Sequence, residues 1–118
     1  MPEMQMGAIE SRFADIIWEN EPVSSSELVR LCAEAFGWKR STTFTVLKRL
    51  CEKGIFQNEK GIVTSRVSRE GFYSAQSKRV VEDSFGGSLP AFIAAFTRSK
   101  PLSEEEKREI LRLIEGED

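Results

Sequence analysis

The segment Trp38–Gly54 (WKRSTTFTVLKRLCEKG) carries the residue types best suited to binding an anion. At the 100° per residue of an α-helix, hydroxyl and cationic side chains fall on one arc and apolar ones on the other. The polar arc holds Ser41, Thr42, Thr45, Lys48, Arg49, Glu52 and Lys53, with Phe44 at its border. The apolar arc holds Thr43, Val46, Leu47, Leu50 and Cys51. Short hydroxyls and cations suit phosphate oxygens and base edges. An ordinary solvent-exposed helix face has a similar composition. The rest of the chain must therefore decide between an anion-binding face and an ordinary exposed one.

Positive charge is concentrated in the middle third of the chain. The 118 residues have a formal net charge of −2, which taken alone argues against a nucleic-acid partner. Residues 38–79 nevertheless hold ten basic and three acidic residues, while 1–37 and 80–118 have net charges of −5 and −4. Because salt screens charges beyond about 8–10 Å, this local excess matters more than the total. The further candidate residues for anion binding in the middle third are Lys39, Arg40, Lys60 and Arg66.

Composition argues against catalysis, metal binding and membrane insertion. The chain has no histidine, the commonest metal ligand and general base, and no glycine-rich phosphate loop follows a strand. We therefore predict no enzymatic activity, no metal site and no cofactor. Cys32 and Cys51 are interpreted as buried thiols in a reducing compartment. No apolar run approaches the ~20 residues of a membrane span, and the N-terminus lacks a signal-peptide pattern. We expect a cytoplasmic protein.

Two amphipathic helices are predicted before the central segment. Apolar residues recur at helical spacing within residues 7–20, at Ile9, Phe13, Ile16 and Ile17, with Trp18 at the edge of the same stripe. A second helix starts at a capping box of Ser24 and Glu27, preceded by Val23, and stops at Gly37. The connection to the third helix is short, so we expect these two helices to cross, with Trp38 filling the corner.

A β-hairpin is predicted after Gly54. Extended patterns at residues 55–58 and 63–67 flank the turn signal Glu59-Lys60-Gly61. Three helices followed by a hairpin form a winged helix-turn-helix, in which the third helix enters the DNA major groove and the hairpin contacts the backbone. Lys60 at the turn and Arg66 on the returning strand would extend the basic surface.

The remaining chain predicts three more helices. Ser88 caps one of them and a Ser103–Glu106 capping box opens another. Their apolar residues are too few for a good core, so we expect pairing with a second copy rather than folding back. The predicted dimerisation residues are Phe85, Leu89, Phe92, Ile93, Phe96, Ile110, Leu111, Leu113 and Ile114. The predicted organisation is a mainly α protein with a small β-hairpin: a winged-helix DNA-binding domain (1–67) and a C-terminal helical dimerisation segment (68–118).

The sequence resembles the penicillinase-repressor and copper-transport-repressor group from about Gly7 to Gly116. The most specific match is TTFTVLKRLCEKG at residues 42–54, preceded by Trp38 and supported by IIWENEPVSSSELV, VSRE, SFGGS and LSEEE. The resemblance implies a dimeric winged-helix transcriptional repressor that binds a palindromic operator in double-stranded DNA. By motif match, the groove-facing and phosphate-facing positions are Arg40, Ser41, Thr42, Thr45 and Arg49. Phe44 takes a position that is often polar in the penicillinase repressors, so it either touches a thymine methyl or packs.

The resemblance also suggests how repression is relieved. Penicillinase repressors are cut at an Asn-Phe bond in the fifth helix, which implies a membrane sensor protease as a partner. The matching pair here is Ala95-Phe96. Copper-responsive members carry clustered cysteines near the C-terminus, whereas this chain has none after Cys51, so we do not expect copper or zinc sensing.

Two alternatives remain open at the level of sequence. One is a winged helix that no longer binds DNA and whose acidic flanks dock a basic protein. The other is a ligand-sensing module with a pocket between the wing and the C-terminal helices. The first alternative predicts no specific complex with DNA and little dependence of binding on salt. A repressor must form a specific complex, and its affinity must fall as salt rises.

Overall fold

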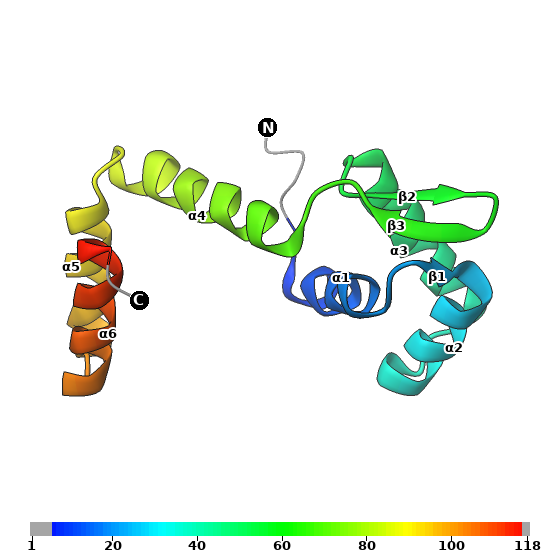
Figure 1. The fold of residues 1–118 in the computed structure, drawn as a ribbon, viewed down its shortest axis with the longest axis horizontal. Helices are drawn as coiled ribbons and strands as arrows, with labels where there is room; N and C mark the ends of the chain where they lie inside the picture. The colour runs from blue at the N-terminus through cyan, green and yellow to red at the C-terminus, as the bar shows by residue number, and fades with distance from the viewer. Residues whose placement is uncertain (1–5, 117–118) are drawn as a thin grey trace. The chain divides into compact units, whose positions relative to one another are not determined.

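The computed structural model describes residues 6–116 and contains six helices and three strands (Figure 1). The chain divides into two compact units, Met1–Ser77 and Lys78–Asp118, with the division inside helix α4. In the first unit the elements are α1 (Ala8–Asn20), β1 (Val23–Ser24), α2 (Ser25–Phe36), α3 (Arg40–Glu52), β2 (Phe56–Glu59), β3 (Ile62–Ser65) and the start of α4 (Arg69–Phe85). In the second, the end of α4 is followed by α5 (Leu89–Ser99) and α6 (Glu104–Glu115).

Helix ends follow the capping signals of the sequence. The Glu27 N–H donates to Ser24 Oγ at 3.0 Å, which starts α2. Gly37 ends α2 in the left-handed conformation, with φ of 70°, a region that glycine adopts without strain. The predicted capping box of Ser103 and Glu106 is complete at the start of α6. Local sequence therefore determines where these helices begin and end.

The predicted hairpin belongs to a three-stranded antiparallel sheet with the order β1-β3-β2. Glu59 pairs with Ile62, so the turn between the strands consists of Lys60 and Gly61 alone. Both turn residues have positive φ values, 55° and 86°, as a tight two-residue hairpin turn requires. The expected winged helix-turn-helix is confirmed. The strand at Val23–Ser24 was not expected, because two residues carry no period and their pairing with β3 depends on tertiary contacts.

One hydrophobic core holds the winged helix together. Its fully buried side chains come from all three helices and both hairpin strands, and include Phe13, Ile17, Leu28, Leu50, Phe56 and Val63. Trp38 fills the corner as expected: its ring centroid lies 4.6 Å from that of Phe36 and 5.8 Å from that of Phe13. The expectation that Ile9 packs inward is wrong. Ile9 is 48% exposed and lies in the first turn of α1, at the end of the helix.

The second unit is much less closed. Helices α5 and α6 are joined by residues 100–103, and Phe92 contacts the ring of Phe85 at a centroid distance of 5.4 Å. No residue in the described part of this unit, 78–116, is buried. These helices therefore carry apolar side chains that a single copy leaves in water.

Candidate nucleic-acid interface

Helix α3 separates its apolar and polar residues as the sequence predicts. Its buried residues are Thr43, Val46, Leu47 and Leu50. The exposed predicted site residues at its start and on its other face are Lys39, Arg40, Ser41, Thr42, Thr45, Lys48 and Arg49. The buried side anchors the helix to the core, so the hydroxyls and cations of the opposite side are presented on a rigid element. Because the helix is rigid, its hydroxyls and cations keep a fixed arrangement that can match the groups of a ligand.

Phe44 packs against the core and also supports a cation. The guanidinium carbon of Arg40 lies 4.9 Å from the centroid of the Phe44 ring, within the range of a cation–π contact. Phe44 is half-buried and contacts the core cluster. The structure shows the predicted packing of Phe44, and its contact with a thymine methyl stays a prediction. The ring contact with Arg40 orders the positive charge at the first turn of α3.

The hydroxyl of Thr45 has a defined orientation. Thr45 Oγ1 donates to the carbonyl oxygen of Ser41, 2.9 Å away on the preceding turn. Because a hydroxyl has a single donor hydrogen and two acceptor lone pairs, the exposed oxygen remains able to accept a hydrogen bond. An outward-facing acceptor can pair with an amino group on a base edge.

Arg49 and Lys53 share a carboxylate that sequence patterns do not reveal. Arg49 Nη1 lies 3.0 Å from Glu10 Oε2, and Lys53 Nζ lies 3.5 Å from Glu10 Oε1. The same Glu10 Oε1 accepts the Gly7 N–H at 3.1 Å, so the carboxylate links the start of α1 to the end of α3. Burial raises the pKa of Glu10, but the Arg49 and Gly7 hydrogen bonds and the charge of Lys53 outweigh it and hold that pKa below its usual value. Glu10 is therefore ionised at neutral pH.

The wing presents its two predicted cations at opposite ends. Lys60 occupies the turn between β2 and β3, with a φ of 55°. The next residue, Gly61, donates its backbone N–H to Asn58 Oδ1 at 3.1 Å, which stabilises the turn. Arg66 follows the end of β3, where its backbone N–H donates to the Ile55 carbonyl oxygen at 2.8 Å. Gly61 and the four residues of β3 lie between them, and β3 alone spans about 13 Å at the usual strand rise. Both are exposed; one is at the tip of the wing and the other at its base.

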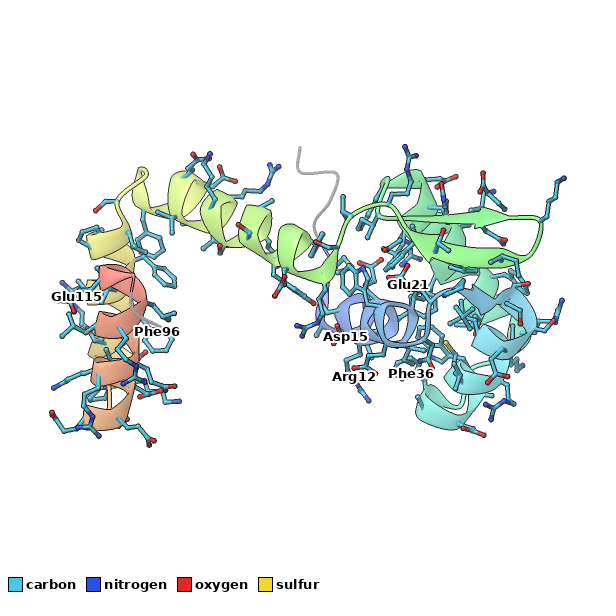
Figure 2. All side chains as sticks on the ribbon, viewed as in Figure 1. Arg12, Asp15, Glu21, Phe36, Phe96 and Glu115 are labelled. Carbon is cyan, nitrogen blue, oxygen red and sulfur yellow. The ribbon has the colours of Figure 1, made fainter. Side chains whose placement is uncertain are left out.

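The base of the wing is also fixed by a carboxylate from the α1–β1 connection. Glu21 accepts hydrogen bonds from the backbone N–H and the hydroxyl of Ser65, at 2.8 and 2.9 Å. Figure 2 labels Glu21 beside the strands of the sheet. This carboxylate holds the end of β3 in place, and with it the backbone that carries Arg66.

The predicted dimerisation residues lie on α5, α6 and the end of α4. Phe85, Phe92 and Ile110 are half-buried within the unit. The others are exposed by 38–77%: Leu89, Ile93, Phe96, Leu111, Leu113 and Ile114. Figure 2 labels Phe96 on α5 within this unit. A group of large exposed apolar side chains is typical of a surface that binds another protein.

Comparison with known proteins places this architecture in a family. Residues 6–116 match the sequence model of the penicillinase repressors. The chain belongs to the penicillinase repressor family. It is also 22% identical to a penicillinase repressor of Bacillus licheniformis over 115 aligned residues. The aligned region covers 94% of this chain and 90% of that protein. The resemblance inferred from sequence is confirmed, and family membership makes this protein a transcription regulator of the repressor class.

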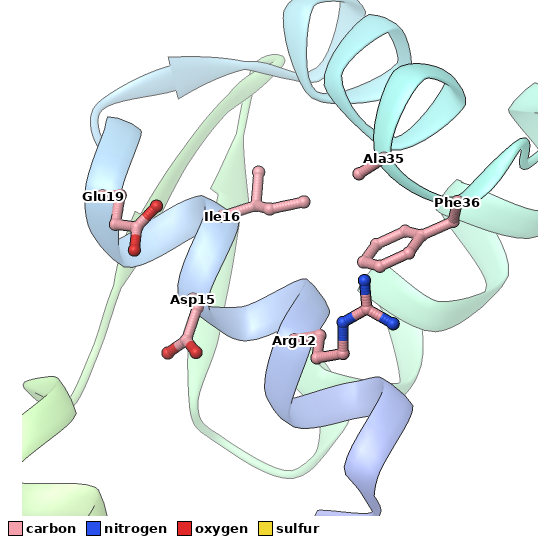
Figure 3. A pocket seen from close by; sticks show the side chains of 6 residues that line it. All are labelled: Arg12, Asp15, Ile16, Glu19, Ala35 and Phe36. Atoms are coloured by element: carbon pink, nitrogen blue, oxygen red, sulfur yellow. The ribbon is translucent and has the colours of Figure 1, made fainter.

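This member of the penicillinase repressor family also has a shallow depression between α1 and α2. Its volume is about 220 Å³, and Arg12, Asp15, Ile16, Glu19, Ala35 and Phe36 line it (Figure 3). The Arg12 guanidinium lies over the Phe36 ring, 5.0 Å from its centroid, and Asp15 is paired with Arg69 at 2.9 Å. Two of the charged lining residues, Arg12 and Asp15, are therefore engaged within the protein.

A metal site needs clustered ligand side chains, and a membrane span needs a long apolar helix. Residues 6–116 contain no group of three or more His, Cys, Asp or Glu side chains arranged to hold a metal ion. None of the described helices is both long and apolar enough to cross a bilayer. Cys32 and Cys51 are free thiols, and burial raises the pKa of both, which favours the protonated thiol at neutral pH.

Proposed function

We propose that this family member is a homodimeric repressor that binds a palindromic operator in double-stranded DNA through α3 and the wing. The observation that carries the proposal is the exposed face of α3, where cations and hydroxyls gather on a helix whose opposite side is buried. In a helix-turn-helix, the second helix is the recognition helix and enters the DNA major groove; α3 has that position here. The repressor would act in the cytoplasm, where its DNA is.

We assign different roles to the exposed groups. Ser41, Thr42, Thr45 and Arg49 would contact base edges, each good contact discriminating by about 1–3 kcal/mol. The remaining cations would bind phosphates and supply affinity that is independent of sequence but sensitive to salt; they are Lys39, Arg40, Lys48, Lys60 and Arg66. Phe44 would orient Arg40, since the two are in contact.

The dimer is supported by the second unit. Its apolar residues remain exposed in one copy, and pairing two copies around a two-fold axis would cover them. We propose residues 68–118 as the dimerisation segment and residues 1–67 as the DNA-binding domain. A dimer presents two recognition helices to half-sites whose centres lie about 34 Å apart, one turn of DNA.

Selection from random DNA tests the proposal and identifies the operator sequence in the same experiment. The full chain is incubated with a pool of random duplexes at low and at moderate salt, and the retained DNA is sequenced. We expect enrichment of a sequence with dyad symmetry and weaker binding as salt rises. A protein-interaction module would enrich no sequence, and that result would refute the proposed function.

A membrane sensor protease is the proposed partner for relief of repression. Ala95 and Phe96 lie inside α5 and are exposed in a single copy, Phe96 by 45%. Because Phe96 is also one of the residues that the proposed dimer would cover, a protease would reach this part of the helix when the dimer surface opens. Because proteases bind extended substrates, α5 must open locally before the bond is cut. Co-expression with a candidate sensor, followed by mass spectrometry of the intact chain, should show a product ending at Ala95. An uncut chain under inducing conditions would count against this partner.

A further inference from the structure

We propose that Glu10 is a positioning residue for Arg49 and that it raises the preference of the protein for its operator over other DNA. The inference rests on the proposed function, because it concerns how the exposed face of α3 discriminates between sequences. Its basis is the three-way contact of the Glu10 carboxylate with Arg49, Lys53 and the Gly7 N–H.

The position of the carboxylate makes it a fixed anchor. The Glu10 side chain is only 14% exposed, whereas that of Arg49 is 51% exposed. Glu10 occupies the third position of α1, where its bond to the Gly7 N–H also completes the start of that helix. A carboxylate bound on two sides in this way has little rotational freedom. It can therefore hold a longer and more mobile partner.

Arg49 keeps binding capacity beyond this contact. A guanidinium carries five N–H donors in a planar fork, and Glu10 accepts a hydrogen bond from one nitrogen, Nη1. The donors on the rest of the fork can face a guanine edge or a phosphate. Arginine side chains lose rotamer entropy when they are ordered. A guanidinium already restrained by Glu10 loses less of that entropy on binding.

The negative charge of Glu10 has a second effect. It neutralises one of the two cations at the end of α3, which weakens attraction to any phosphate backbone that passes nearby. Specific DNA regains this loss through the aligned Arg49, whereas non-specific DNA does not. Glu10 would thus weaken binding to non-specific DNA and also orient Arg49 toward the operator, and each effect increases specificity.

Glu10→Gln separates charge from local structure. Glutamine serves at the third helical position as glutamate does, so the start of α1 is retained while the ion pairs are lost. The matched control is Glu34→Gln, which removes the same charge from an exposed ion pair with Arg30 on α2. Binding is measured for each full-length dimer with the duplex selected by the wild-type protein and with a scrambled duplex of equal composition.

We expect Glu10→Gln to bind the scrambled duplex roughly twofold to fivefold more tightly, as loss of one surface charge allows. We expect the ratio of selected to scrambled affinity to fall by roughly fivefold or more, the lower end of what one well-placed side chain contributes to discrimination. Glu34→Gln should leave that ratio unchanged. In an Arg49→Ala background, Glu10→Gln should no longer lower the ratio, because the residue through which it acts is absent.

Two results would overturn the assignment. An unchanged ratio in Glu10→Gln would reduce Glu10 to a stabiliser of α1. A ratio that falls equally in the Arg49→Ala background would show that Glu10 acts by another route. If the wild-type protein does not prefer the selected duplex at all, the proposed function fails as well, so the two failures are distinguishable.

Discussion

The indole nitrogen of Trp18 donates a hydrogen bond to the Val67 carbonyl oxygen at 3.1 Å, across 49 residues of sequence. Trp18 lies on α1, and Val67 lies between the wing and the start of α4. The Trp18 ring also contacts Phe72, with centroids 6.0 Å apart. One side chain thus fixes the point at which the chain leaves the sheet and enters α4.

Replacing Trp18 with phenylalanine should destabilise the winged helix. The substitution leaves the Val67 carbonyl without its donor and removes part of a large ring from the core. An unsatisfied, partly buried acceptor costs about 1–3 kcal/mol. Urea denaturation should show a free energy of unfolding lowered by at least that amount. Tyr73→Phe, which keeps the ring contact with Trp18, serves as the control and should change stability much less.

Replacing Arg49 with alanine should weaken binding to the selected duplex by about 1–3 kcal/mol. The side chain is 51% exposed, so its loss should leave the fold intact. Arg30→Ala is the matched control, because Arg30 lies on α2 and is bound by Glu27 and Glu34. Fluorescence anisotropy with labelled duplex gives both affinities. Equal binding by folded Arg49→Ala protein would refute the assignment of Arg49 as a DNA contact.

A charge on the apolar surface of α6 should prevent dimer formation. Leu113 is 77% exposed, so Leu113→Glu should not disturb the helix itself but would place a carboxylate in the proposed contact. Burying an unpaired charge at an interface is strongly unfavourable. Analytical ultracentrifugation should show a dimer for the wild type and a monomer for Leu113→Glu. The control is Ser26→Glu, which adds the same charge at an exposed residue of α2 and should remain a dimer. A dimer in all three proteins would exclude this surface.

The stability of the winged helix should depend on the charge of Glu10. The pKa of Glu10 is lowered in the folded protein from its usual value of 4.5. Folding therefore favours the ionised form, and the stabilisation is fully present above pH 4.5 and is lost as the pH falls through the folded pKa. The difference in unfolding free energy between wild type and Glu10→Gln should be constant from pH 5 to 7 and shrink below pH 4.5. A difference that does not change with pH would contradict the ion pairs.

Much of the winged helix could be predicted because its signals are local. The alternation of apolar and polar residues in α3 repeats within one helical turn, so Leu47 and Leu50 are assigned inward whatever their partners are. Ser24, Ser103 and Gly37 mark helix ends through bonds to backbone groups a few residues away. The Lys60-Gly61 turn lies between two extended runs for a similarly local reason.

Contacts between distant residues could be found only in the folded chain. Glu10 and Arg49 are 39 residues apart, and Asp15 and Arg69 are 54 apart; nothing in their spacing marks them as pairs. Strand β1 is two residues long and exists because β3 passes beside it. The sequence by itself therefore determined which face of α3 is polar and where the helices begin. Tertiary structure decided which carboxylate holds Arg49, because that pairing depends on how the core packs α1 against α3.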